Sequence, residues 1–206
     1  MISTYLILAS VTFVAMMSPG PDMMIVVKHS GARTRWPALL CIVGICCGVS
    51  VHVAFSILGI AAVIAANATL FSALKLAGAA YLVYIGVKSL LSGGGFQFDA
   101  TEANGDKNRA TPFRDGLLCN VLNPKVTIFI MAIFSQLIEL ATPTFDKALY
   151  GAFLTLEVFV VWNLFVSFVR TRLVPGVIQK FQVTIDRVVG VLLIGFGGAL
   201  ALERAR

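Results

Sequence analysis

Ser18-Pro19-Gly20-Pro21-Asp22 places two prolines and an acid in the middle of an apolar run that extends from Ile2 to Val27. A proline inside a helix lacks a hydrogen-bond donor, and its ring crowds the carbonyl four residues earlier. The helix is therefore expected to break here, which frees the carbonyls of Ala15 and Met17. We expect it to restart with Ser18 as the N-cap and a proline as the first helical residue.

The same event recurs at Asn123-Pro124-Lys125, inside a second apolar run from Leu117 to Leu140. Here Asn123 is the expected N-cap, and Pro124 frees the carbonyl of Asn120. Lys125 follows Pro124 as Asp22 follows Pro21, so opposite charges occupy matching places. These two charges form either a structural ion pair or a pair for which a ligand competes.

The composition is that of a membrane protein. Of the 206 residues, 58% are hydrophobic and only 13% are charged, which is far more apolar than an ordinary globular domain. A helix needs about 20 apolar residues to cross a bilayer. Six segments approach or exceed that length, at about residues 3–27, 37–65, 70–91, 115–140, 148–169 and 186–202.

Basic residues gather in alternate loops between these segments, which predicts the orientation of the chain, because cytoplasmic loops are enriched in Lys and Arg. Both termini are then expected outside the cytoplasm. The net charge of +6 is thereby explained as a topology signal, and a nucleic-acid partner is not expected. The loops concerned hold Lys28, Arg33 and Arg35; Lys88, Lys107, Arg109 and Arg114; and Arg170, Arg172, Lys180 and Arg187.

A polar, glycine-rich stretch at residues 92–112 reads as a cytoplasmic linker. It separates a first three-helix repeat, residues 1–91, from a second, residues 113–206. Because three spans is an odd number, two like-folded halves must enter the membrane in opposite orientations. The fold class predicted is an all-α membrane protein of six transmembrane helices, built as two inverted three-helix repeats whose first and fourth helices are broken by proline.

Three titratable side chains inside the predicted spans, Asp22 among them, have both a structural and a functional interpretation. Asp22 either complements the dipole of the restarted helix or lines a polar site, and we favour the site because a carboxylate at membrane depth is costly. Glu157 either titrates protons or has no role. His52 either relays protons or makes a structural hydrogen bond across a helix interface, and the structural role is favoured.

Small and sulfur-containing residues in the spans are expected to pack. The Gly44-x-x-x-Gly48 spacing allows close helix approach, either within the chain or, as the alternative, in a homodimer. The cysteines show neither a Cys-x-x-Cys motif nor histidine in ligand spacing, so no metal site and no cofactor are predicted. They are Cys41, Cys46, Cys47 and Cys119.

Three motifs together resemble the LysE/RhtB family of bacterial amino-acid exporters over nearly the whole chain. They are Ser18-Pro19-Gly20-Pro21, the run from Leu76 to Gly86 (LAGAAYLVYIG), and Phe113-Arg114-x-Gly116-Leu117-x-x-Asn120-x-x-Asn123-Pro124-Lys125. The resemblance implies six helices in the bacterial inner membrane, with both termini periplasmic on the charge pattern. It also implies export of small amino acids or their derivatives, driven by protons. Phe134-Ser135-Gln136-Leu137 stands where the family often has a Leu-Pro-Gln-Phe-like sequence, so a straighter helix end is expected there.

These features give one hypothesis for mechanism: a zwitterionic amino acid binds between Asp22 and the second break. Its ammonium would face Asp22 and the freed carbonyls, and its carboxylate would face Lys125 or the half-helix N–H groups. Asp22 is the first candidate for proton coupling, followed by Glu157 and His52. The predicted substrate-binding residues are Ser18, Pro19, Gly20, Pro21, Asp22, Asn120, Asn123, Pro124 and Lys125.

Three other functions remain open at this level. A metal-ion exporter would need a convergent set of acids, histidines or thiolates on the broken helices. A membrane thiol-redox enzyme would use the four cysteines. A packing subunit of a larger complex would need no polar groups at the helix breaks.

Overall fold

Apolar helices make up almost all of the part of the chain that the computed structural model describes, which is residues 2–18, 20–66, 68–91, 110–138, 142–170 and 174–203. No strand occurs in these ranges. Pro19 and residues 92–109 of the predicted linker lie outside them, and residues 110–112 are helical. The helices are α1 (Ile2–Met17), α2 (Pro21–Ser30), α3 (Trp36–Ala66), α4 (Ala68–Leu90), α5 (Ala110–Val121), α6 (Pro124–Leu137), α7 (Thr144–Val169) and α8 (Val174–Glu203).

Two sharp bends interrupt the helical path, one between α1 and α2 (70°) and one between α5 and α6 (59°). Pro21 is the first residue of α2, and Pro124 is the first residue of α6. The prediction for Asn123 is confirmed, because it is the N-cap of α6 and its side chain accepts a hydrogen bond from the Lys125 amide at 3.1 Å.

The prediction that Ser18 caps α2 is wrong, because the N-cap is Gly20, which makes no side-chain cap hydrogen bond. The physical reason is the place of the second proline. With Pro21 at the first helical position, the residue directly before it becomes the cap. The Ser18 hydroxyl instead accepts a hydrogen bond from another part of the chain, described below.

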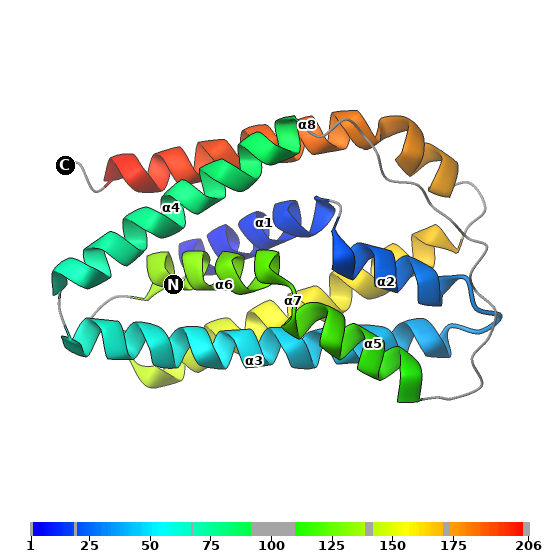
Figure 1. Cartoon of the computed structure of the whole chain (residues 1–206), viewed down its shortest axis with the longest axis horizontal. Coiled ribbons are helices and arrows are strands. Elements are labelled where there is room, and N and C mark those ends of the chain that lie inside the picture. Colours follow the sequence, from blue (N-terminus) through cyan, green and yellow to red (C-terminus); the bar gives the residue numbers. More distant parts are fainter. Residues whose placement is uncertain are drawn as a thin grey trace.

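The helices pack as two outer pairs with the half-helices α1 and α6 between them, and α5 packs on α3 (Figure 1). Helices α4 and α8 lie side by side along one edge, α3 and α7 contact each other along the opposite edge, and α1 and α6 lie between the pairs. Contacts of α1 with α7 and α8, and of α6 with α3 and α4, join the layers. Both bends therefore lie between the two outer pairs.

Three helices, α3, α4 and α7, are each long and apolar enough to cross a membrane, and up to five spans result if each bent pair counts as one. This count covers the described residues, and α8 is not among the helices that meet the test. Large apolar side chains are exposed on α1, α3, α4, α7 and α8, as expected where lipid covers helices. Examples are Leu6, Phe13, Phe55, Leu58, Leu76, Leu156, Leu164 and Val191.

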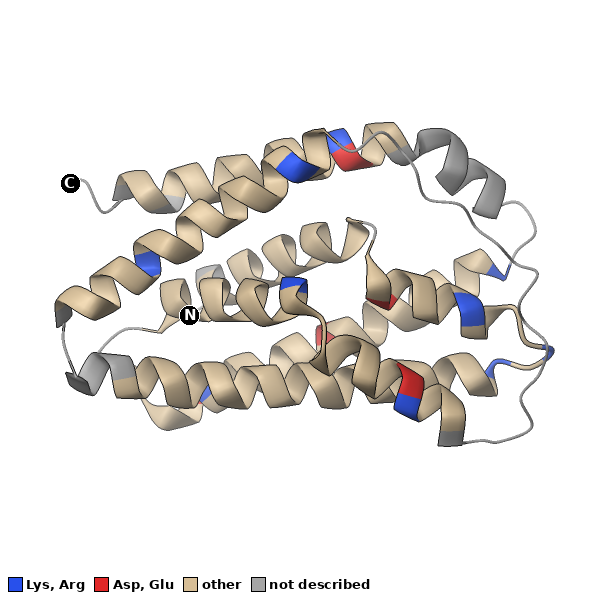
Figure 2. Ribbon diagram, in the orientation of Figure 1, with Lys and Arg blue, Asp and Glu red and all other residues tan. Residues whose placement is uncertain are grey.

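Basic side chains gather at one end of the molecule, where the α2–α3 connection, the start of α5 and the end of α7 meet (Figure 2). The Arg170 guanidinium donates hydrogen bonds to the carbonyls of Ser30, Ala32 and Thr34 at 2.9–3.1 Å. His29 Nε2 lies 3.0 Å from Asp115 Oδ2. Helices α2, α5 and α7 are therefore tied together at this end.

Glycines bring the helices into close contact. Gly44 lies against the Phe113 carbonyl, and Gly116 lies against the Cys41 carbonyl, so the Gly44-x-x-x-Gly48 motif packs α3 on α5 within the chain. Gly86 of α4 and Gly190 of α8 face each other's backbone: a Cβ added to either would lie 2.6–2.7 Å from the carbonyl oxygen of the other. These contacts depend on the absence of side chains.

Substituting Gly190 with Ala is expected to destabilise the protein by about 1–3 kcal/mol, because the new methyl group would overlap the Gly86 carbonyl and force α4 and α8 apart. Gly195→Ala in the same helix is the matched control, since no described atom lies within 4 Å of a Cβ there. Thermal unfolding in detergent measures both. Equal stability of the two variants would show that the α4–α8 contact is not as close as described.

Candidate functional site

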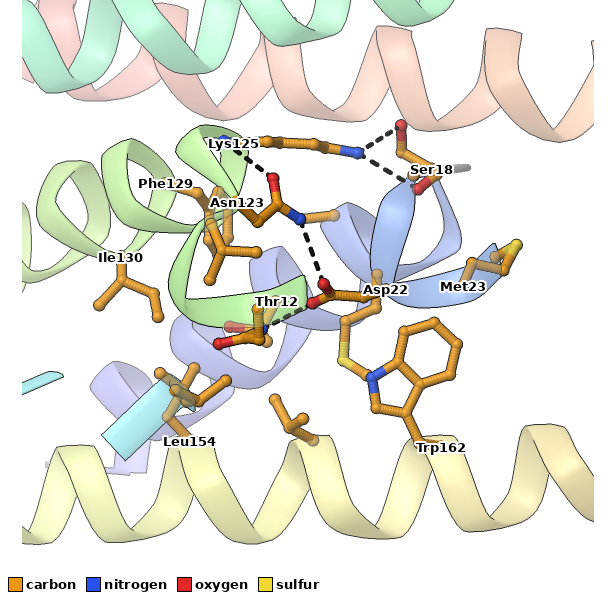
Figure 3. Close-up of a pocket in the computed structure, with 17 residues that line it drawn as sticks. Thr12, Ser18, Asp22, Met23, Asn123, Lys125, Phe129, Ile130, Leu154 and Trp162 are labelled. Carbon is orange, nitrogen blue, oxygen red and sulfur yellow. Dashed lines mark hydrogen bonds between the residues drawn. The ribbon is translucent and has the colours of Figure 1, made fainter. Parts of the chain in front are cut away.

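The first turn of α2 meets the α5–α6 break inside the molecule, and Asp22 lies at the junction (Figure 3). Asn120 Nδ2 donates to Asp22 Oδ2 at 2.6 Å, and Asn123 Nδ2 donates to Asp22 Oδ1 at 3.2 Å. The Cys119 thiol, a weak donor, lies 3.7 Å from the same oxygen. The carboxylate is thus stabilised by neutral donors, and hydrogen bonds to a charged acceptor are among the stronger ones.

Lys125 lies on the other side of the break and is also held by neutral groups. Its ammonium donates to the Ser18 carbonyl at 3.2 Å and to the Ser18 hydroxyl at 3.0 Å. Gly20 lies beside it, since a Cβ at Gly20 would be 3.6 Å from Lys125 Nζ, an ordinary van der Waals contact. No ion pair joins Asp22 to Lys125. The two opposite charges therefore remain separate, as a ligand with both charges requires.

Both charges line one cavity of about 80 Å³, several times the roughly 10–15 Å³ that a single water needs. Its polar end contains Ser18, Asp22, Asn123 and Lys125, and the opposite wall, which includes Leu154 and Trp162, is apolar (Figure 3). The full lining comprises Thr12, Ala15, Met16, Ser18, Gly20, Asp22, Met23, Val49, Asn120, Asn123, Lys125, Val126, Phe129, Ile130, Leu154, Val158 and Trp162.

Of the nine residues predicted to bind substrate, the structure brings six together on this cavity: Ser18, Gly20, Asp22, Asn120, Asn123 and Lys125. Pro21 and Pro124 are the first residues of the helices that carry Asp22 and Lys125, and both line a neighbouring cavity of about 940 Å³. That cavity also includes Ser18, Gly20, Asn123 and Lys125, and it extends to Tyr81, Lys88 and Asp186. Pro19 lies outside the described residues.

Two of the three freed carbonyls that were expected to bind an ammonium, those of Ala15 and Asn120, already accept hydrogen bonds from the backbone. The Ser18 amide donates to the Ala15 carbonyl at 3.3 Å, and the Asn123 amide donates to the Asn120 carbonyl at 3.0 Å. The first backbone donors of α6 are likewise paired, since the amides of Lys125 and Val126 bond to Asn123. At the second break, these backbone groups are therefore hydrogen-bonded within the chain. The cationic group that remains there for a substrate carboxylate is the Lys125 side chain.

His52 and Gly48 support the break from α3. His52 Nε2 lies 3.0 Å from the Asn120 carbonyl, and because a carbonyl can only accept, this nitrogen is the donor. His52 does not line the cavity. A Cβ at Gly48 would lie 2.5 Å from Asn120 Oδ1, so only glycine leaves room for this side chain. Sequence reasoning had assigned Gly48 to helix packing alone and missed its contact with Asn120.

The other predicted proton-coupling residue, Glu157, lies near the middle of α7 and is half-buried. It lines neither the Asp22 cavity nor the neighbouring one. Its Oε2 atom is buried and has no hydrogen-bond partner among the described residues. Glu157 is therefore a separate acid within a helix long and apolar enough to cross a membrane, and is not part of the cluster around Asp22.

The cysteines differ in their surroundings, and only one of them contacts the site. Cys41 and Cys46 are buried, Cys47 is exposed, and Cys119 alone contacts Asp22. Within the ranges that the structure describes, no cluster of three His, Cys, Asp or Glu side chains is arranged to hold a metal ion.

These observations indicate the class of protein: an α-helical membrane protein with oppositely charged side chains in a cavity between two broken helices. The chain matches the LysE type translocator family over residues 13–204. It belongs to this family of membrane transporters. No solved structure gives a significant match.

Several relatives align with nearly the whole chain. It is 31% identical to the uncharacterized membrane protein YrhP of Bacillus subtilis, over 93% of this chain and 96% of that protein. It is 29% identical to the threonine efflux protein of Escherichia coli K12 and 30% identical to that of Salmonella typhi, each over 99% of this chain and 100% of the relative.

The hydrogen bond from Asn120 to the Asp22 carboxylate is expected to stabilise the fold by about 1.5–3 kcal/mol. A double-mutant cycle of Asn120→Ala and Asp22→Asn, read by chemical unfolding in detergent, isolates this contribution from the packing of Asn120. The substitution at Asn120 should cost less when position 22 is Asn. Equal costs in both backgrounds would contradict the hydrogen bond.

Proposed function

We propose that this protein is a secondary active exporter of small amino acids or their close derivatives, which it moves out of the cytoplasm in exchange for protons. The observation that carries the proposal is the pair of opposite charges, Asp22 and Lys125, on one small cavity without an ion pair between them. A zwitterion carries both complementary charges. The threonine efflux proteins among the relatives support the same substrate class.

In the proposed complex, the substrate ammonium lies against Asp22 and its carboxylate against Lys125. The ammonium reaches a carboxylate already placed by Asn120 and Asn123. The carboxylate replaces Ser18 as an acceptor for the Lys125 ammonium. Fixed donors and acceptors of this kind reduce the cost of ordering the site on binding. The apolar wall at Leu154, Val158 and Trp162 faces the substrate side chain.

The transport cycle rests on a six-span architecture of two inverted halves in the inner membrane, with periplasmic termini. Support comes from the pairing of α3 with α7 and of α4 with α8, which hold corresponding places in the two halves. The clustering of basic residues at one end supports a cytoplasmic position for that end. One half would then rock against the other around the fixed site.

Proton coupling requires a group that holds either a proton or the substrate, but not both at once. Asp22 meets this condition in the proposed complex, because protonation removes the charge that the ammonium needs. Glu157 and His52 are the second candidates: the first is an intramembrane acid with a buried oxygen, and the second contacts the backbone of Asn120. Neither metal-ion export nor thiol-redox chemistry has a matching cluster in the described part of the chain.

Efflux of a panel of labelled amino acids from preloaded proteoliposomes, with and without an imposed pH gradient, tests the proposal. We expect gradient-dependent export of small neutral amino acids. Asp22→Asn should reduce gradient-driven export at least tenfold, because it removes both the ammonium partner and the titrating group. The matched control is Asp146→Asn, which changes an acid in the first turn of α7 outside the cavity.

Export by Asp22→Asn at the wild-type rate would contradict the assignment of Asp22. Absence of export for every amino acid in the panel, from correctly inserted wild-type protein, would contradict the proposed function itself.

A further inference from the structure

Thr12 is a buried polar residue in the cavity that the mechanism above does not use. It belongs to α1, lines the same cavity as Asp22, and its side chain is 3% exposed. Its hydroxyl has no hydrogen-bond partner among the described residues. A buried hydroxyl without a partner is costly, so its presence calls for an explanation.

Other Ser and Thr side chains in the helices of this chain find a hydrogen-bond acceptor within their own helix. A Ser or Thr inside a helix can donate to the carbonyl four residues earlier. Six side chains do so at 2.6–3.1 Å: Ser10, Ser30, Ser50, Thr127, Thr155 and Ser167. Thr12 does not bond to Leu8 in this way. Its hydroxyl is therefore available to a molecule in the cavity.

The position of Thr12 indicates which part of a ligand it meets. In Figure 3, Thr12 lies next to Asp22, between that residue and the wall that includes Ile130 and Leu154, whereas Lys125 lies on the other side of Asp22. If the α-ammonium and α-carboxylate are held by Asp22 and Lys125, the ligand side chain points toward Thr12. No charged residue lines that wall, so a charged ligand side chain would have no counter-charge there.

We propose that the Thr12 hydroxyl selects amino acids with a small hydroxylated side chain over apolar amino acids of the same size, a specificity role that rests on the proposed function. A hydroxyl both donates and accepts, so a ligand hydroxyl can bond to Thr12 either as the donor or as the acceptor. An apolar isostere leaves the Thr12 hydroxyl buried and unpaired. Sites that hydrogen-bond a ligand hydroxyl reject the analogue that lacks it far more strongly than apolar pockets reject small differences in size.

L-Threonine and L-valine are a suitable pair of probes, because they differ by a hydroxyl in place of a methyl group. Thr12→Val makes the same exchange in the protein. Concentration-dependent efflux from proteoliposomes is measured for both amino acids with wild type, Thr12→Val and Thr12→Ser. Thr155→Val is the matched control, since Thr155 bonds to the Gly151 carbonyl and does not line the cavity.

Wild type should prefer threonine over valine by roughly tenfold or more. Thr12→Val should reduce this preference to about twofold or less, chiefly by improving valine and weakening threonine. Thr12→Ser and Thr155→Val should keep the preference. Because Thr12→Val removes a buried unpaired hydroxyl without changing shape, the variant should fold at least as stably as wild type.

Three outcomes overturn the assignment of Thr12 while leaving amino-acid export in place. They are a wild type that exports valine as well as threonine, an unchanged preference in Thr12→Val, and an equal loss for both amino acids in that variant. The last would place Thr12 against the shared α-amino or carboxylate groups. Export of no amino acid by wild type overturns the proposed function and this inference with it.

Discussion

The structure depends on a carboxylate inside the protein that is hydrogen-bonded by amides and makes no ion pair with a cation. Burying an acid is costly unless its oxygens are hydrogen-bonded. Asn120 and Asn123 meet that need for Asp22. The consequence is functional, because Lys125 makes no ion pair with Asp22 and instead bonds to Ser18. The two charges are thus kept close to one cavity and apart from each other.

The backbone breaks make this arrangement available. The bend between α5 and α6 falls at Asn123, and the side-chain amides of Asn120 and Asn123, on its two sides, both donate to Asp22. The bend is supported from α3 by His52, which bonds to the Asn120 carbonyl, and by Gly48, which leaves room for the Asn120 side chain. The site is therefore held by elements from both halves of the sequence.

Much of this could be predicted from the sequence, and for local reasons. The prolines fix where helices start, and the Asn123 cap follows from its position before Pro124. The matching breaks placed Asp22 near Asn120 and Asn123, but the direct hydrogen bonds between them could not be assigned, because Asn120 lies about a hundred positions away and only the packed fold joins them. Thr12 carries no local signal at all. A threonine in an apolar helix normally bonds to its own backbone, and only the structure reveals that this one does not.

The central claim is that a zwitterion is held between Asp22 and Lys125. The most direct test measures which residue recognises which charge of the ligand. Binding to the purified protein is measured for threonine, its methyl ester, which lacks the carboxylate charge, and its analogue with the amine replaced by hydrogen. In wild type, both analogues should bind at least tenfold more weakly than threonine. Lys125→Met should remove the discrimination against the ester alone, and Asp22→Asn should remove that against the deaminated analogue alone. Loss of both discriminations in either variant, or of neither, would contradict a zwitterion held between Asp22 and Lys125.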